Sequence, residues 1–516
     1  MDKMREEIRL VIAFAFAIAI ILIFGKMQSK QAPQTVKPEE PPAVTAEKET
    51  PETGEKPFSF KPASETESGE EKIYENGRFI IKLDTAGGMI KKIGLKEYTR
   101  KDETSIPVLE SSDLLLNYVE GFEESASAVY EFQKTGELLV FQNYSQNLLT
   151  EKAITIPTDS YTFKSEIAVY NKSADTAVIK NYAVSAGKID LSPLKTRGRQ
   201  FIPPEIIIDT GGKTATMNAA RIKASSLYEN TNWIAVKQNY GLVFLRAGKA
   251  AKSFVSPEDG HIKIGFIYEN IEIKPGEREK LEFAFYAGPA DYFIASKEIG
   301  EKQVFGTSVF AAMGRFLFAA LYQIHRVIPN WGWTIILLTL IIKIVFFPLT
   351  MKSLRSMKAM QKLRPYMQDL QKKYKGNPQQ MQKELMNLYR EYKINPMGGC
   401  LPMLVQFPIF IGFFIALRNS VFLRGAPFML WIKDLSLPDT IANIGGFNLN
   451  LLPIIMAATS FWQQKLTPQE PSQKALTYMM PIMFLFLFYN FSAGLLLYWT
   501  TMNMAGLVEQ YFVHKR

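Results

Sequence analysis

The sequence predicts an α-helical polytopic membrane protein, in which a large all-β domain separates an N-terminal anchor helix from a five-helix core. Three observations lead to this fold class. Mean hydropathy is only −0.03, yet the apolar residues of the 516-residue chain are gathered into a few runs. About 220 residues after the first run alternate with a period of two, which is typical of strands. Most of the net charge of +10 lies in one polar stretch beside another apolar run.

The first element is an anchor helix within residues 1–26. Leu10–Phe24 is free of charge and follows three basic residues, and no small-x-small cleavage site comes after it. We therefore expect an uncleaved signal anchor with its N-terminus in the cytoplasm. Residues 27–71 are rich in proline, glutamate, lysine and threonine, and this composition predicts a disordered linker.

Residues 72–300 are expected to form an all-β sandwich outside the cytoplasm. Alternation is clear in Phe79–Leu83, Thr162–Tyr170 and His261–Phe266, and turn signals recur at short intervals. No catalytic constellation is apparent in this region. The sequence Gly211–Thr214 resembles the end of a phosphate-binding loop, but the glycine that the motif needs is Ile207 here, so a surface turn is predicted.

Residues 305–330 are predicted to form an amphipathic helix that lies in the membrane interface. Apolar residues recur at spacings of three and four between Ser308 and Ile328, while Arg315 and Arg326 share another face. A spanning orientation would place Arg315 in the middle of the bilayer. The interfacial orientation brings the arginines to the headgroups instead.

Residues 331–516 contain five apolar segments that we expect to span the membrane. These are Trp331–Thr350, Leu401–Leu417, Asn450–Trp462, Leu476–Tyr489 and Leu495–Val508. The last two are about 21 Å long as helices, shorter than the hydrocarbon core of about 30 Å. Either polar residues extend them into the interface or the bilayer is thinner around them.

The distribution of charge fixes the orientation of these segments. Between Lys352 and Lys393, eleven basic residues face three acidic ones, which places this loop in the cytoplasm. Residues 419–446 carry two charges of each sign, as expected outside, and the chain ends on His514–Arg516, as expected inside. Six spans with both termini in the cytoplasm satisfy these counts.

The basic stretch at 353–393 is predicted to be a helical hairpin in the cytoplasm. Met360, Leu363, Met367, Leu370 and Tyr374 follow heptad-like steps, and a second such series follows the break at Lys375–Pro378. The methionines either pack in the seam or form a surface for varied apolar segments. The lysines are either a solvated face or a contact for lipid headgroups or ribosomal RNA.

Lys343 is the most informative single residue, because a charge in the middle of a membrane helix costs about 2.5–3.5 kcal/mol. It shares a face with Thr339. Either the lysine reaches the nearby cytoplasmic interface, or it faces a hydrated cavity in the bundle. No acidic residue precedes Glu509 in these five segments, so an unpaired cation that transiently receives negative charge is predicted.

Metal, disulfide and enzyme chemistry are not expected. The chain has one cysteine, Cys400, and three histidines that lie far apart. We therefore expect no cofactor, no metal site, no small-molecule substrate and no catalytic residues. The missing intramembrane acids and inverted repeat argue against a small-solute channel or transporter, which stays the main alternative. A scaffold whose β domain is the working part is a third.

Together, several motifs between residues 305 and 513 resemble the YidC/Oxa/Alb family of membrane protein insertases. They include Asn330–Trp333, Phe347–Thr350, Asn395–Pro402, Gln406–Phe410, Ala426–Phe428 and Ser492–Tyr498. The anchor and the large β domain resemble the Gram-negative form. The resemblance implies a bacterial inner-membrane protein that inserts and helps to fold nascent membrane proteins. Its expected partners are these clients, the ribosome, the Sec translocon and membrane lipids.

The resemblance also implies a hydrophilic groove that opens to the cytoplasm and the lipid. The family usually has arginine at the position of Lys343, so the charge is kept here but the bidentate guanidinium is lost. Thr339 matches a groove-lining position, and Tyr498 and Trp499 match an aromatic pair near the groove. Ser460 and Gln464 are further candidates for its lining.

Overall fold

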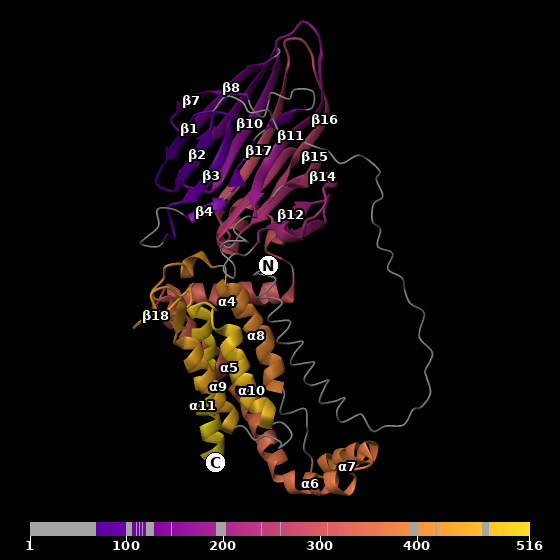
Figure 1. Cartoon of the computed structure of the whole chain (residues 1–516), viewed down its shortest axis with the longest axis vertical. Coiled ribbons are helices and arrows are strands. Elements are labelled where there is room, and N and C mark those ends of the chain that lie inside the picture. Colours follow the sequence, from indigo (N-terminus) through magenta and orange to yellow (C-terminus); the bar gives the residue numbers. More distant parts are fainter. Residues whose placement is uncertain are drawn as a thin grey trace, which may run out of the picture.

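A computed structural model describes residues 69–99, 106–191, 203–392, 401–466 and 474–515, except residues 110, 113, 116, 120–127, 146, 239, 259, 307 and 419. The chain forms an elongated molecule with a β-rich part at one end and a bundle of helices at the other (Figure 1). The predicted anchor, and the linker up to residue 68, lie outside the described residues.

The β-rich part contains two sheets. The smaller has the strand order β1-β2-β3-β4. Its strands are β1 (Glu71–Glu75), β2 (Phe79–Asp84), β3 (Met89–Leu95) and β4 (Ile106–Leu109). The larger has a main path of β13-β12-β14-β15-β17-β10-β9-β8-β7, with β11, β16, β5 and β6 attached to it. Its strands are β5 (Ser111–Ser112), β6 (Asn117–Val119), β7 (Glu131–Thr135), β8 (Leu138–Ser145), β9 (Leu148–Thr155), β10 (Thr162–Asn171), β11 (Ala177–Asp190), β12 (Glu205–Asp209), β13 (Thr214–Asn218), β14 (Ser226–Lys237), β15 (Gly241–Glu258), β16 (His261–Ile273) and β17 (Arg278–Pro289).

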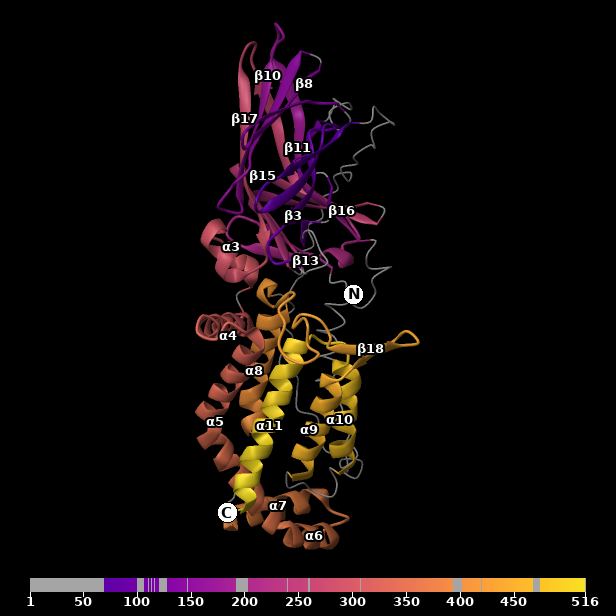
Figure 2. The ribbon, with the colours of Figure 1, turned by 90° about the vertical axis from the view of Figure 1, so that its left-hand side faces the viewer.

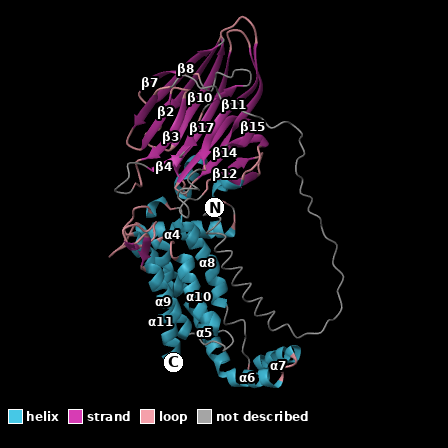
Figure 3. Cartoon of the chain, in the orientation of Figure 1, coloured by secondary structure: helices cyan, strands magenta, loops and turns pink. Residues whose placement is uncertain are grey.

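The long strand β15 makes the larger sheet into a sandwich. Its first half, from Gly241 to Ala247, pairs with β17, and its second half, from Lys252 to Glu258, pairs with β16. The two layers therefore share one strand. Figure 3 shows the strands of the β domain gathered at one end of the molecule, and an aromatic core lies between their inner faces. Phe163 and Phe285 stack there at 4.6 Å, and Phe79 of the smaller sheet packs on Phe163 at 5.0 Å.

This part confirms the strands predicted from alternation. The turn at Gly211–Thr214 is also confirmed, because Gly211 and Gly212 have positive φ and join β12 to β13. The sequence analysis did not anticipate helix α3 (Tyr292–Ile299), which follows the last strand. Its N-terminus is capped by Asp291, which accepts hydrogen bonds from Phe293 N and Ile294 N.

A fully buried lysine joins the two sheets. Lys152 of β9 donates hydrogen bonds to Gly87 O (2.5 Å), Leu115 O (2.9 Å) and Gly88 O (3.1 Å), and its Nζ lies 4.8 Å from the ring centroid of Tyr130. The turn between β2 and β3 thus directs two carbonyls at one ammonium. An ammonium has three donors, so the site satisfies each of them.

We expect Lys152→Met to lower the free energy of unfolding of the β domain by about 2–4 kcal/mol, because three buried carbonyls lose their donor. The measurement is resistance of the β domain to protease during a urea titration of the full chain. The control is Lys164→Met on the neighbouring strand, where the side chain is exposed. Equal urea midpoints for the two variants would show that the lysine does not hold the sheets together.

Helix α4 (Val309–His325) lies across the end of the helix bundle that faces the β domain (Figure 2). Its predicted apolar face is buried at Leu317 and Leu321, whereas Phe310 is exposed. Arg315 does not point away from the protein, because its Nη1 donates to Gly306 O at 2.9 Å and its guanidinium lies over the ring of Tyr292.

Aromatic contacts join the β domain to the bundle beside α4. Tyr98 packs on Phe422 at 5.5 Å, and Phe293 of α3 stacks on Phe318 of α4 at 5.8 Å. Phe318 in turn stacks on Trp331 at 6.2 Å. The contact between the two parts is therefore a small aromatic cluster rather than a shared sheet or helix.

The bundle itself consists of helices that run between the end near α4 and the opposite end (Figure 2). The remaining elements are α5 (Trp331–Lys362), α6 (Arg364–Lys373), α7 (Pro378–Glu391), α8 (Leu401–Arg418), β18 (Thr440–Ile444), β19 (Phe447–Asn450), α9 (Leu452–Leu466), α10 (Lys474–Phe488) and α11 (Ala493–Lys515). The last apolar run is divided into α10 and α11 at the position that its sequence predicts.

Helix α5 differs from its predicted length, because it does not end at Thr350. It continues to Lys362, since residues 351–362 contain no glycine or proline and form a helix readily. The break comes at Leu363, just before Pro365 in the first turn of α6. The first residues of the predicted hairpin, 353–362, therefore belong to α5.

In the described part of the chain, α5 is the one helix that is both long and apolar enough to cross a membrane. The segments Val309–His325, Gln406–Arg418 and Met479–Phe488 are apolar but shorter. Large apolar side chains nevertheless face outward from several helices. Examples are Ile344 (72% exposed), Val345 (64%) and Phe486 (78%).

Candidate functional site

Helix α11 lies between α5 and α9 (Figure 2), and the three helices carry a set of buried or half-buried polar side chains. We call this set the polar cluster. It contains Thr339 and Lys343 of α5, Thr459, Ser460, Gln463 and Gln464 of α9, and Thr500, Asn503, Glu509 and Gln510 of α11. Each of these side chains is buried or half-buried.

The loop between α8 and α9 fixes where α9 and α11 begin. Asp439 Oδ2 accepts hydrogen bonds from Leu451 N and Leu452 N at the start of α9. The backbone N–H groups of Ala493 and Gly494, at the start of α11, donate to Leu437 O and Leu435 O. One loop thereby accepts hydrogen bonds from the free N–H groups at the starts of both helices. These hydrogen bonds hold the first turns of α9 and α11 next to each other.

An ion pair joins α5 to α11 deep in the bundle. Lys343 Nζ lies 2.9 Å from Glu509 Oε2, and the side chains are only 14% and 9% exposed. Lys343 stands twelve residues into α5, about 18 Å from its outer end. The expectation of an unpaired cation is therefore wrong. Glu509 looked terminal in sequence, but α11 continues to Lys515 and turns the carboxylate toward α5.

Gly506 leaves room for this pair beside α9. A Cβ atom at Gly506 would lie 2.3 Å from Gln463 Nε2 and 3.6 Å from Lys343 Nζ. Side chains from α5 and α9 therefore meet over a position of α11 that has no side chain. One helical turn away, Asn503 Nδ2 donates to Ser460 Oγ at 2.7 Å and links α11 to α9.

The residues predicted from sequence lie at two depths. Thr339 is fully buried, and its hydroxyl donates to Ile335 O at 2.7 Å within its own helix. Ser460 contacts Asn503 as described, and Gln464 is half-buried one turn further along α9. Together with Lys343, these residues belong to the polar cluster.

Tyr498 and Trp499 lie nearer the outer end and pack against other helices. Tyr498 stacks on Phe413 of α8 at 4.1 Å, and Trp499 contacts Phe410 of α8 at 4.6 Å and Phe488 of α10 at 5.2 Å. The Tyr498 hydroxyl is buried without a hydrogen-bond partner among the described residues. This aromatic pair closes the bundle above the polar cluster.

The predicted hairpin is present as α6 and α7, at the end of the bundle opposite the β domain (Figure 1). Leu363, Met367 and Tyr389 are buried between the helices, with Met360 and Leu385 packed against them. Met360 and Met367 therefore pack in the seam, as the simpler of the two predictions has it. Met386, Tyr366 and Tyr392 stay exposed.

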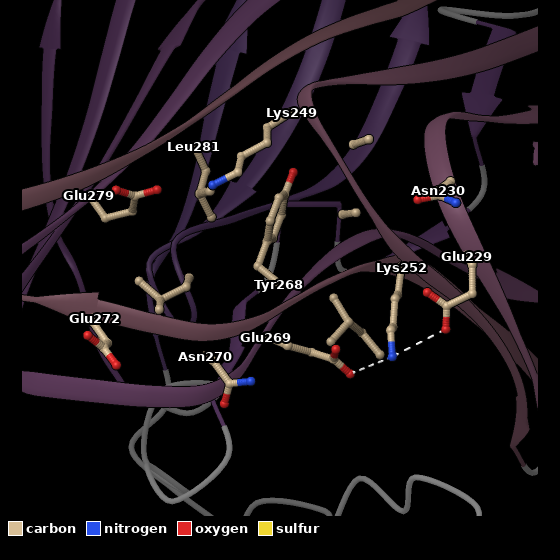
Figure 4. Close-up of a pocket in the computed structure, with 14 residues that line it drawn as sticks. Glu229, Asn230, Lys249, Lys252, Tyr268, Glu269, Asn270, Glu272, Glu279 and Leu281 are labelled. Carbon is tan, nitrogen blue, oxygen red and sulfur yellow. Dashed lines mark ion pairs between the residues drawn. The ribbon is translucent and has the colours of Figure 1, made fainter. Parts of the chain in front are cut away.

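A surface pocket of about 450 Å³ lies in the β domain (Figure 4). Its lining is polar and comes from β14, β15, β16 and β17. Lys252 pairs with Glu229 at 3.2 Å and with Glu269 at 3.0 Å, so its charge is already satisfied. Lys249, Tyr268 and Glu279 line the other side. The pocket shows no pairing of an acid with a base that would suggest catalysis.

Sequence reasoning missed Gln463, Asn503, Gly506 and Glu509. A signal was present, since Asn503, Gly506 and Gln510 follow helical spacing within an otherwise apolar run. The described residues contain no group of three or more histidine, cysteine, aspartate or glutamate side chains that could hold a metal.

Comparisons with known proteins identify related families for both parts of the chain. A family model described as "60Kd inner membrane protein" matches residues 323–516, and one described as "YidC periplasmic domain" matches residues 74–302. The first covers the bundle with the polar cluster, and the second covers the β domain.

Several relatives are named "Membrane protein insertase YidC". The protein of Pelobacter propionicus is 32% identical over 475 residues, 85% of each chain, and that of Syntrophobacter fumaroxidans is 32% identical over 430 residues, 80% of this chain and 77% of the relative. The protein of Endomicrobium trichonymphae is 39% identical over 290 residues, slightly more than half of each chain. Among solved structures, YidC from Thermotoga maritima is 15% identical, covers 85% of this chain and 98% of its own, and has a TM-score of 0.31.

Proposed function

Because this chain belongs to the YidC family of membrane protein insertases, we propose that it inserts nascent proteins into the bacterial inner membrane through the polar cluster. The main support for this proposal is the Lys343–Glu509 ion pair, which is largely shielded from solvent among amide and hydroxyl side chains. The outer surface of the same bundle is apolar. Such an interior offers hydrogen bonds to a polar flank that would otherwise cross hydrocarbon unsatisfied.

The arrangement of helices suggests a path for the client. Its polar flank enters from the cytoplasmic side and exchanges hydrogen bonds with Ser460, Gln464 and Asn503 between α9 and α11. Its apolar segment stays against the exposed apolar faces of the helices and passes into lipid. Tyr498 and Trp499 close the outer end, so the polar flank does not leave a continuous pore.

Five helices, α5 and α8–α11, form the membrane-spanning core in this proposal, with α4 at the outer interface. The hairpin α6–α7 then lies in the cytoplasm and the β domain in the periplasm. The hairpin, residues 364–392, contributes +3 of the charge of +8 counted between residues 352 and 393, and the last turns of α5 contribute +4. That charge suits contact with ribosomal RNA or anionic lipid, and the Sec translocon is a further partner.

The test is insertion of a single-span client, made by translating ribosomes, into liposomes that contain only this purified chain. We expect the translocated tail to become protected from external protease, because the polar cluster lowers the barrier to its transfer. Protection no greater than in protein-free liposomes would contradict the proposal.

Transport of a small solute remains the alternative, and one observation now favours it more than the sequence did. The argument against transport relied on a missing intramembrane acid, whereas Glu509 pairs with Lys343. Flux of ions or small solutes through liposomes without any nascent chain would support transport. Family membership and the closed aromatic end of the bundle favour insertion.

The β domain is expected to be largely dispensable for insertion, because the polar cluster comes entirely from α5, α9 and α11. Deleting residues 75–290 keeps Phe293 and its stack on Phe318. We expect the shortened chain to insert clients within about twofold of the intact chain, since distant sites contribute nearly independently. The measurement is rescue of cells depleted of their own insertase. Failure at normal protein levels would contradict this.

A further inference from the structure

Glu509 is the only acidic residue in the sequence of α5 and α8–α11, and the structure places it against Lys343 of α5. Its carboxylate lies 2.9 Å from Lys343 Nζ, and neither side chain is more than 14% exposed. An acid at this depth needs a counter-ion, and so does the lysine. In the resting chain, each neutralises the other.

We propose that Glu509 sets client specificity, because it is an internal counter-ion that acidic residues of the client must displace from Lys343. This rests on the proposed function, in which the client's polar flank enters the polar cluster. A client carboxylate can replace the Glu509 carboxylate without leaving the ammonium unpaired. The cost of admitting one acid to the bundle is then largely an exchange of partners.

The surroundings of the pair allow such an exchange. Gly506 lacks a side chain next to Lys343 Nζ. The amide of Gln463 from α9 also contacts this position, and an amide N–H can donate to a carboxylate. Glu509 lies six residues before the last residue of α11, about 9 Å along the helix. Once displaced, its side chain therefore has a short way to the cytoplasmic interface.

The proposal predicts opposite effects for the two partners. Removing Lys343 takes away the attraction for client acids, whereas removing the Glu509 charge takes away their competitor. A pair that merely braces α5 against α11 would give the same defect from either side. Neutralising Glu509 should therefore raise, not lower, the insertion of acidic clients.

The experiment measures insertion into liposomes of two clients whose translocated tails differ only by Asp-to-Asn changes. We expect Glu509→Gln to increase insertion of the Asp client roughly threefold to tenfold, the range that corresponds to losing a partly screened ion pair. Insertion of the Asn client should not change. Glu277→Gln, which removes the same charge from an exposed turn of the β domain, is the matched control.

Two further variants separate specificity from stability. Glu509→Asp lengthens the ion pair but keeps the charge, so a smaller increase in the same direction is expected, even if Glu509→Gln folds poorly. The double variant Lys343→Met/Glu509→Gln removes both charges. It should abolish the increase in insertion of the Asp client. Equal losses for both clients in Glu509→Gln and Glu509→Asp would overturn the proposal and leave a structural brace. If the unaltered chain inserts neither client, the proposed function itself fails, which is a separate result.

Discussion

Replacing residues 364–392 by a short glycine–serine linker is expected to abolish insertion while the bundle still folds. Helices α6 and α7 pack on each other through Leu363, Met367 and Tyr389, and the pair is attached to the bundle at the end of α5. Their removal takes away the pair of helices, with a net charge of +3, that lies at the end of the bundle opposite the β domain. We expect insertion to fall to the level of protein-free liposomes.

The boundaries of this replacement matter, because α5 continues to Lys362. A deletion from residue 353 would remove three turns of α5 and could disturb the bundle directly. The control variant keeps the whole hairpin, including its seam residues, and replaces only the exposed Lys372 and Lys383 by glutamine. Normal insertion of a single-span client by the linker variant would refute a receiving role for the hairpin.

Neutralising Lys343 is expected to have the second large effect, and only on clients with acidic tails. At an effective dielectric of about 20, opposite charges 4 Å apart gain about 4 kcal/mol before desolvation and the displaced contact with Glu509 are subtracted. Part of that gain offsets the transfer of a client carboxylate. Lys343→Ala should therefore slow insertion of acidic-tail clients about tenfold or more, the change that follows when about 1.4 kcal/mol is lost.

The charge-conserving Lys343→Arg should be tolerated, whereas Lys343→Glu, which puts two carboxylates side by side, should be worse than alanine. Neutral-tail clients should insert at similar rates with Lys343→Ala and with the unaltered chain. The measurement is protease accessibility of the translocated tail in vesicles. Insertion of acidic-tail clients at the unaltered rate by Lys343→Ala would mean that the lysine contributes only to packing.

Local sequence pattern predicted those elements whose structure depends mainly on residues that are close together in the sequence. Alternation located strands such as β10 and β16, and the glycines before Lys213 located a turn, because these depend on near neighbours. Helix α5 was predicted too short because the apolar run ends near Thr350, while the helix passes through Pro348 and meets no further proline or glycine until Pro365.

The site was predicted only in part, for a physical reason. Lys343 is recognisable alone, because a charge in an apolar run is costly wherever the helix lies. Its partner is recognisable only after α11 is placed beside α5, since 166 residues separate Lys343 from Glu509. The role of Gly506 is likewise invisible in sequence, because it consists of the space left for Gln463 of another helix.

The most direct test of the central claim is photo-crosslinking of a ribosome-stalled, single-span client from defined positions in the bundle. The account predicts strong crosslinks from positions 343 and 464 in the polar cluster to the client's polar flank. A probe at position 345, whose side chain is 64% exposed on the outer face of α5, should reach at most the apolar segment. Crosslinks to the polar flank from position 345, with none from 343 or 464, would contradict a path through the polar cluster.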